Sequence, residues 1–301
     1  MAERTQRSVL TVAEQLGYHT NAAARSLRSG RVRTLAIVPS SEDIGGFTSS
    51  LLLHAAQAAR AREHGLLLLP DIDWRQRVAQ VLNSGQADGV ILHNGVAPTG
   101  ADIAEHVKRM VVLQDRAGPL PELGLRVAID ASPALRRLME HLLDLGHTRI
   151  AYFSPQIHTG TRLNAYRDTM QSHAGPIASA YVVTADPLSD EMPLVARRLL
   201  EQQPRPTAVL CGTDVLALGI YQAAAQLGLE IPRDLSVAGV GLHGIWEALR
   251  PRLTALVSPA AEMASTAVDL LIRAIESPDE EPSSIVLEAS IAFGGSTAPP
   301  L

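Results

Sequence analysis

Short apolar runs alternate with amphipathic helical segments along most of this chain of 301 residues. An apolar run at 34–39 is followed by a helical period at 49–64, a second run at 66–70 and a second helical period at 74–84, and the alternation continues to residue 240. Parallel strands need crossovers, and right-handed crossovers place helices on both faces of a sheet. The pattern therefore predicts an α/β fold built on doubly wound parallel sheets.

The alternation falls into two successive sets. In the first set we expect strands at 34–39, 66–70, 88–93 and 110–114, and helices at 49–64, 74–84 and near 102–109. In the second set we expect helices at 133–145, 161–173, 194–202 and 215–227, and strands at 149–153, 181–184, 208–211 and 235–240. Two sets predict two similar subdomains with a cleft between them. The carboxyl ends of the strands, where ligands bind in such sheets, would face that cleft.

The composition is typical of a soluble globular protein, because 46% of the residues are hydrophobic and 19% are charged. No apolar run reaches about 18 residues and no signal-peptide pattern is present, so we expect a cytoplasmic protein without a membrane partner. The single cysteine, Cys211 in AVLCGTD, fits a buried thiol at a strand end better than a nucleophile.

The formal net charge of −5 is unevenly distributed. Residues 1–33 contain six arginines and two acidic residues, so this segment carries +4 and the remainder of the chain carries −9. A basic arm on an acidic body indicates a polyanionic partner at one end. The alternative interpretation is a solvated basic tail without a ligand.

Two short helices are predicted in this basic segment. The first, at 8–16, has one apolar face and ends at Gly17. Asn21 is a suitable N-cap for a second helix at 22–28. The second helix has too few apolar residues to bury itself, and isolated helices of this length are marginal in water. It therefore needs a partner in order to form.

The run LGYHTNAAARSLRSGRVRTLAIVP at 16–39 closely resembles the junction between headpiece and core in LacI-type transcription regulators, with Thr20 in place of the usual proline. Two further segments match motifs of that family, HLLDLGHTRIAYF at 141–153 and RPTAVLCGTDVLALGIYQAAAQLGLEIPRDLSVAGV at 205–240. The likeness covers residues 5–297. It implies a periplasmic-binding-protein-like core with a short N-terminal helical hinge segment, acting as a homodimeric DNA-binding regulator, in most cases a repressor, under the control of a small-molecule effector.

The resemblance also implies discontinuous subdomains. Residues 1–33 would form a partial DNA-binding headpiece and the hinge helix, 34–130 with 260–282 the first core subdomain, and 131–259 with 283–301 the second. Family members begin with a helix-turn-helix that enters the major groove, and both of its helices are absent from the sequence as given. We favour a truncated chain over a core-only relative, because a hinge motif has little use in a protein that never meets DNA.

The resemblance implies a set of contacts to operator DNA in the hinge segment: Asn21, Ala24, Arg25, Leu27, Arg28 and Arg31. Leu27 takes the place of a leucine that enters the minor groove, where an apolar side chain unstacks a base step and kinks the duplex. The arginines are the natural phosphate neighbours. Phosphate contacts position a protein without specifying sequence, so the chain as given should bind DNA weakly and with little base discrimination.

The resemblance implies a second set of contacts, to the effector: Ser40, Ser41, Asp115, Arg162, Thr213 and Asp214. Asp115 stands where the family has a carboxylate that accepts hydrogen bonds from ligand hydroxyls. Arg162 matches an arginine whose planar fork binds hydroxyls or a carboxylate. The alternatives are a loop or helix cap for Asp115 and a surface charge at a helix start for Arg162.

Several positions depart from the pattern of a sugar site. Thr213 replaces the usual asparagine, and the turn at 239–242 lacks the family's carboxylate. Ile129 and Ala260 stand where aromatic residues often stack on a ring. The effector is therefore expected to differ from a typical pyranose, unless the chain senses nothing through this cleft.

Catalytic and cofactor motifs are incomplete throughout the sequence. Lys108 is the only lysine, which excludes a Walker A loop, and no serine stands in G-x-S-x-G. The histidines lack the i, i+4 spacing of a helical zinc site. We therefore expect neither an enzyme nor a metal or cofactor site. The remaining alternative is a cytosolic small-molecule-binding protein of the same fold without a DNA role, which would have no reason to keep the hinge motif.

Overall fold

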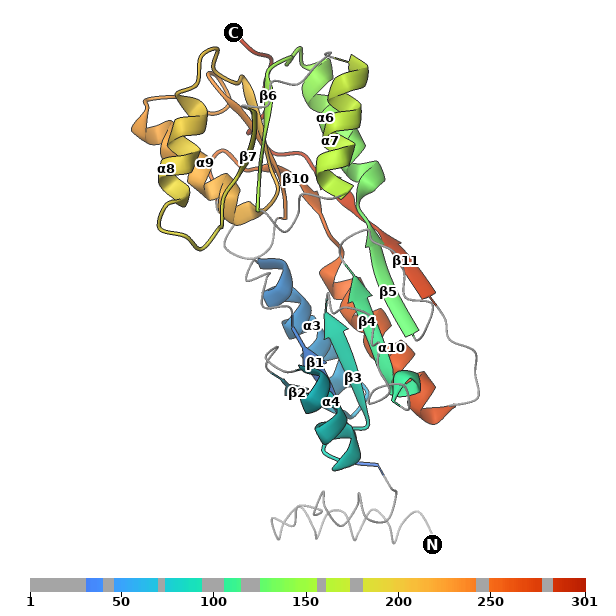
Figure 1. Ribbon diagram of the computed structural model, residues 1–301. Helices are drawn as coiled ribbons and strands as arrows, with labels where there is room; N and C mark the ends of the chain where they lie inside the picture. The colour runs from blue at the N-terminus through green and yellow to red at the C-terminus, as the bar shows by residue number, and fades with distance from the viewer. Residues whose placement is uncertain are drawn as a thin grey trace, which may run out of the picture.

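The computed structural model describes residues 31–39, 46–69, 74–93, 106–114, 125–155, 161–173, 181–241, 249–277 and 284–301. These residues form two six-stranded sheets, each covered by helices (Figure 1). The helices predicted at 8–16 and 22–28 lie outside the described residues. No helix within the described ranges is long and apolar enough to cross a membrane.

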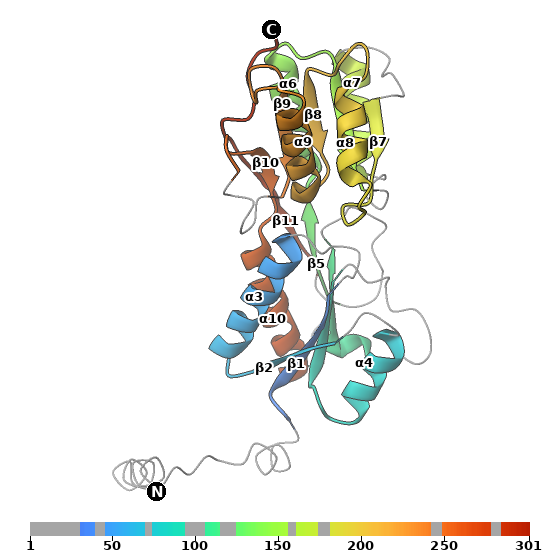
Figure 2. The same cartoon turned by 90° about the vertical axis from the view of Figure 1, so that its left-hand side faces the viewer.

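The first sheet is parallel throughout. Its strands run in the order β11 (Ser284–Glu288), β5 (Leu125–Asp130), β4 (Met110–Gln114), β3 (Gly89–His93), β1 (Thr34–Val38) and β2 (Gly65–Leu68). Helices α3 (Gly46–Ala61) and α10 (Ala260–Glu276) pack on one face, and α4 (Trp74–Asn83) packs on the other (Figure 2). A short 3-10 helix, η1 (Val107–Arg109), precedes β4.

The second sheet is parallel except at one edge, where β12 runs antiparallel to β10. Its strands run in the order β12 (Ser290–Ala292), β10 (Thr254–Val257), β9 (Ser236–Val240), β8 (Ala208–Cys211), β6 (Ile150–Ser154) and β7 (Val182–Thr184). Helices α6 (Ser132–Asp144) and α7 (Thr161–His173) lie on one face, and α8 (Met192–Leu200) and α9 (Asp214–Gln226) on the other. Helices on both faces of parallel sheets confirm the predicted α/β class.

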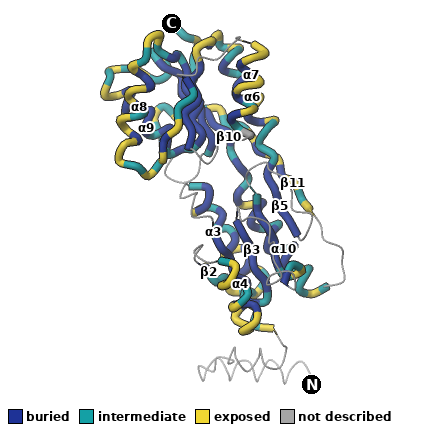
Figure 3. The backbone as a smooth tube through the Cα atoms, in the orientation of Figure 1, coloured by how far each residue is buried: buried dark blue, intermediate teal, exposed yellow. Residues whose placement is uncertain are grey.

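Burial on both faces explains the continuous apolar runs of the strands. In β1, Leu35 and Ile37 contact the core beneath α3 and α10, whereas Ala36 and Val38 contact the core beneath α4. Figure 3 shows that most residues of the central strands are buried, whereas the outer faces of the helices are exposed.

The chain passes between the two sheets three times, after β5, after β10 and after β11. The carboxyl ends of β5 and β10 therefore both lie at the junction, and the arrowheads of β3 and β4 in Figure 1 point toward the second sheet. Because all the parallel strands of a sheet end at the same edge, the carboxyl edges of the two sheets face each other.

Two elements of the first sheet differ from the sequence-based expectation. The strand β5 was not predicted, because Arg126 and Asp130 interrupt its apolar run. Residues 283–301 were assigned to the second subdomain, whereas β11 pairs with β5 along five residues and only the following strand, β12, joins the second sheet. This pairing supplies the backbone groups of β5 with hydrogen-bond partners and buries Leu287.

Candidate functional site

Polar groups and close backbone approaches gather where β6, β8 and β9 end, at the edge of the second sheet that faces the first. Residues 154–155 follow β6, residues 212–213 follow β8, and Gly241 follows β9. This edge is the place where ligands bind in open α/β sheets.

Arg162, the second residue of α7, reaches across to the end of β8. Its Nη1 donates a hydrogen bond to the carbonyl oxygen of Gly212 over 3.2 Å, and its side chain is half-buried. A cation at a helix amino end gains nothing from the helix dipole, so this hydrogen bond is what holds the side chain there. A guanidinium has five N–H donors in a planar fork, and within the described residues one of them is used, which leaves the others for a carboxylate or for hydroxyl groups.

Gly212 brings the ends of β6 and β8 into close contact. Its N–H donates to the carbonyl oxygen of Phe153 over 2.7 Å. A Cβ atom at this position would lie 2.7 Å from Oγ of Ser154 and 3.2 Å from Cδ of Pro155. A side chain at position 212 would displace Ser154, so glycine is what allows the ends of β6 and β8 to lie this close.

Thr213 and Asp214 form the start of α9. The side chain of Thr213 caps the helix, because its Oγ1 accepts from the N–H of Leu216 over 3.3 Å. Asp214 is buried, and its Oδ1 accepts from the N–H of Val215 over 2.9 Å. A carboxylate in the first turn of a helix is favoured by the helix dipole. Both predicted effector residues therefore also have a structural role.

Gly241 lies directly against this carboxylate. Its φ is +93°, in the left-handed region that favours glycine, and a Cβ atom there would be 3.2 Å from Oδ2 of Asp214. This turn lacks the carboxylate that the family pattern has there, as the sequence indicated. The backbone of Gly241, and not a side chain, therefore packs on Asp214.

Tyr152 is a residue of this region that sequence reasoning missed. Its ring stacks on that of Tyr166 with centroids 5.2 Å apart, and its hydroxyl is buried without a hydrogen-bond partner among the described residues. Burial raises the pKa of the Tyr152 phenol, while the neighbouring Ser154 hydroxyl and Arg162 guanidinium lower it in part. The available signal was the period of two in β6, which places Tyr152 and Ser154 on one face.

The opposite edge, formed by the first sheet, presents His93 at the end of β3 and Gln114 at the end of β4. The ring of His93 lies 5.8 Å from that of Phe47, which is the second residue of α3. Oε1 of Gln114 is buried and accepts no hydrogen bond in the described part of the chain. Neither His93 nor Gln114 was predicted.

Three predicted effector residues lie outside the described residues: Ser40, Ser41 and Asp115. Ile129 and Ala260 occupy positions where aromatic residues of the family often stack on a ligand ring. Both are buried in the main core. Cys211 is fully buried, as predicted, and burial raises the pKa of its thiol.

Of the predicted DNA contacts, the structure describes only Arg31. Its Nη2 donates to the carbonyl oxygen of Ile275 over 3.0 Å, and its Nη1 lies 3.8 Å from the carboxylate of Glu276. Arg31 thereby joins the entry to β1 to the last turn of α10, where a cation complements the helix dipole. The other five lie outside the described residues: Asn21, Ala24, Arg25, Leu27 and Arg28.

The sequence matches the family of periplasmic binding protein-like domains over residues 139–297, which is more than half of the chain. Catabolite control protein A of Priestia megaterium is 28% identical, across 97% of this chain and 90% of its own length. The ribose operon repressor of Haemophilus influenzae is 27% identical, across 96% and 88%. A solved LacI family regulator of Enterococcus faecium with bound ribose has a TM-score of 0.76 at 24% identity, covering 88% of this chain and 99% of that one.

Two parallel sheets that meet at their carboxyl edges and are joined by three crossovers define a two-lobed ligand-binding core. The chain belongs to the periplasmic binding protein-like family and is a LacI-type, effector-controlled transcription regulator. The family predicted from the hinge and core motifs is therefore confirmed. The relatives named above are regulators, not enzymes.

Proposed function

We propose that the effector is a hydroxylated metabolite, a sugar or a related acid, bound between the carboxyl edges of the two sheets. The observation that carries this proposal is the position of the Arg162 guanidinium at the junction, where one of its five donors binds the Gly212 carbonyl among the described residues. The bound ribose of the Enterococcus faecium regulator and the cellobiose complex of the regulator CelR, which has a TM-score of 0.74 at 23% identity, support this ligand class.

The proposed contacts differ between the two sides of the cleft. On the second sheet Arg162 supplies donors, with Thr213 and Asp214 beside it. On the first sheet the proposed contacts are Ser40, Ser41 and Asp115. Ile129 and Ala260 are buried in the core and offer no ring to stack on. The contacts proposed here are therefore charged and hydrogen-bonding groups, which suit an acidic or extensively hydroxylated ligand.

Binding between two lobes joined by three crossovers changes the balance between open and closed arrangements of the core. We propose that this balance sets the spacing of the basic N-terminal segments of two subunits on operator DNA in the cytoplasm, with the contacts Asn21, Ala24, Arg25, Leu27, Arg28 and Arg31. The effector and the operator would then affect each other's affinity by the same factor.

Thermal unfolding with ribose, gluconate and cellobiose tests the effector proposal. A ligand at about 100 times its dissociation constant adds about 2.7 kcal/mol to the free energy of unfolding, which raises Tm by several degrees. We expect at least one of the three to produce this rise. Arg162→Gln should abolish the rise and leave the Tm of the free protein within about 1 °C.

The matched control is Arg167→Gln, which removes an exposed arginine from the same helix. This variant should keep the full ligand-dependent rise. A rise that survives Arg162→Gln undiminished would contradict the assignment of Arg162 to the effector site.

A further inference from the structure

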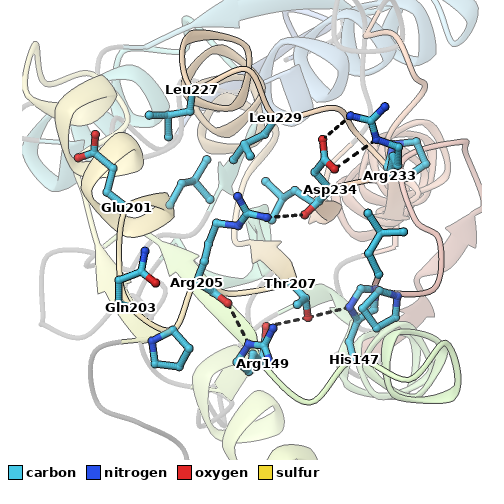
Figure 4. Close-up of a pocket in the computed structure, with 16 residues that line it drawn as sticks. His147, Arg149, Glu201, Gln203, Arg205, Thr207, Leu227, Leu229, Arg233 and Asp234 are labelled. Carbon is cyan, nitrogen blue, oxygen red and sulfur yellow. Dashed lines mark hydrogen bonds and ion pairs between the residues drawn. The ribbon is translucent and has the colours of Figure 1, made fainter.

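A second cavity lies at the opposite edge of the second sheet, where β6, β8 and β9 begin (Figure 4). It has a volume of about 520 Å³, and its floor is built from residues that precede those strands, Arg149 before β6, 205–207 before β8 and 234–235 before β9. A strand of this length spans roughly 16 Å, so the cavity is separate from the effector cleft at the other edge. Its volume is within the usual range for small-molecule sites.

The cavity has an apolar wall where two helices end. Leu200 is the last residue of α8, and Leu227 and Leu229 follow α9. Pro204 and Pro232 complete the wall with rigid rings. A ligand with an aliphatic or aromatic body can therefore bury apolar surface here.

Two arginines line the cavity, and each donates a hydrogen bond to a backbone carbonyl. Nε of Arg149 donates to the carbonyl oxygen of Arg205 over 2.9 Å, and Nη2 of Arg205 donates to the carbonyl oxygen of Asp234 over 3.4 Å. Figure 4 shows Arg205 extending between Leu229 and Arg149. Among the residues that the structure describes, no carboxylate lies within 4.0 Å of either guanidinium.

The acidic residues of the lining are already paired with other arginines. Oδ2 of Asp234 lies 3.0 Å from Nη2 of Arg233, and the hydrogen bond from Arg233 lowers the pKa of Asp234. Oε1 of Glu201 lies 2.8 Å from Nε of Arg197. Neither carboxylate forms an ion pair with Arg149 or Arg205, although the charge of Arg205 also contributes to the lowered pKa of Asp234.

Nearby helix ends reduce this positive charge by about half. Both α8 and α9 end at the cavity, and each helix carboxyl end carries roughly half a negative charge. His147, also in the lining, adds no charge at neutral pH, because burial lowers its pKa and Thr207 and Ser236 occupy its ring nitrogens. A ligand carboxylate could therefore make the ion pairs that Arg149 and Arg205 do not make within the described residues.

We propose that this cavity is a second ligand site, which binds a small monocarboxylic acid with an apolar body. The carboxylate lies between Arg149 and Arg205, whose planar forks match its two oxygens, and the body lies against the leucines at the ends of α8 and α9. The site is distinct from the effector cleft and does not depend on the identity of the effector.

Isothermal titration of the full chain with octanoate at low ionic strength tests the proposal. Octanoate has roughly ten non-hydrogen atoms, and we expect a dissociation constant on the order of 1 mM. Octanamide has the same shape and no charge, so it should bind at least about tenfold more weakly. Equal binding of the two probes to the unaltered protein would overturn the proposal, and this comparison does not depend on the folding of any variant.

Two variants locate the site. The double variant Arg149→Gln, Arg205→Gln should weaken octanoate binding at least about tenfold. Arg198→Gln removes an exposed arginine of α8 that does not line the cavity, and it should keep the original affinity. If Arg162→Gln abolishes octanoate binding and the double variant keeps it, the probe occupies the effector cleft and the proposal is wrong, whatever the effector proves to be.

Discussion

Arg126 is a buried arginine that forms no ion pair with another described residue. It is 4% exposed, it lies beside Val112 of the neighbouring strand, and its Nε has no hydrogen-bond partner within the described part of the chain. Burial lowers the pKa of its guanidinium. Because burying an unpaired charge is costly, Arg126→Met should raise the free energy of unfolding by about 1–3 kcal/mol.

Urea denaturation measures this change. Arg198→Met, at an exposed position of α8, is the matched control and should shift the free energy by less than about 0.5 kcal/mol. A loss of stability in Arg126→Met would show that the guanidinium has a favourable partner, contrary to the prediction.

His147 makes stability depend on pH near neutrality. The ring is buried, its Nε2 lies 2.9 Å from the carbonyl oxygen of Ala298, and desolvation lowers its pKa in the folded state. His147 therefore takes up a proton near pH 6.5 in the unfolded chain, but only at lower pH in the folded protein. The free energy of unfolding is highest above pH 6.5 and falls as the pH decreases below it. The slope for one such group is at most about 1.4 kcal/mol per pH unit.

Denaturation between pH 7.5 and 5.5 measures that slope. His147→Gln replaces the ring with an uncharged polar side chain and should reduce the slope, although its stability at pH 7.5 is lower. Parallel pH profiles for the two proteins would refute the assignment to His147. His141, whose pKa burial also lowers, accounts for part of the remaining slope.

At the scale of elements, two glycines begin the parallel strands on either side of β1 and differ in their surroundings. A Cβ atom on Gly89, at the start of β3, would lie 2.7 Å from Cδ1 of Leu271 and 2.9 Å from Cδ1 of Ile275, both in α10. A Cβ atom on Gly65, at the start of β2, would meet nothing closer than 3.6 Å. Gly89→Ala therefore requires the side chains of Leu271 and Ile275 to move from their packed positions.

We expect Gly89→Ala to lower the free energy of unfolding by about 1–3 kcal/mol, the usual cost of overpacking. Gly65→Ala should change it by less than about 0.5 kcal/mol. Thermal denaturation of both variants measures these changes. Equal changes in the free energy of unfolding would show that the packing against α10 adjusts to the extra methyl group without a loss of stability.

The elements also show what the sequence could predict. Strands buried on both faces, such as β1, were predicted from their continuous apolar runs. The strand β5 was not, because Arg126 and Asp130 break its run, and the place of β11 beside it depends on pairing between segments far apart in the chain. In the candidate site, a sequence motif indicated Arg162, whereas the strand period at Tyr152 did not reveal that its ring is buried against Tyr166.

At the scale of the whole molecule, charge is separated along the chain. Residues 1–33 carry +4 and the remainder carries −9, so a duplex should be attracted by the first segment and repelled by the core. Each phosphate that an arginine neutralises releases counterions, and the logarithm of the affinity then falls linearly with the logarithm of the salt concentration. The slope of that line counts the arginines that meet phosphates.

Fluorescence anisotropy with a random-sequence duplex at several salt concentrations measures this slope for the chain as given. The double variant Arg25→Gln, Arg28→Gln should reduce its magnitude by roughly 1.8, because each phosphate contact contributes about 0.9. The control Arg136→Gln, Arg137→Gln removes the same charge from exposed positions on α6 and should leave the slope unchanged. If both double variants reduce the slope equally, the net charge of the protein determines the salt dependence of DNA binding, and the N-terminal segment is not the DNA-binding surface. If only the first does, the contacts lie in the segment that precedes the core, where a change in the spacing between two cores can be transmitted to DNA.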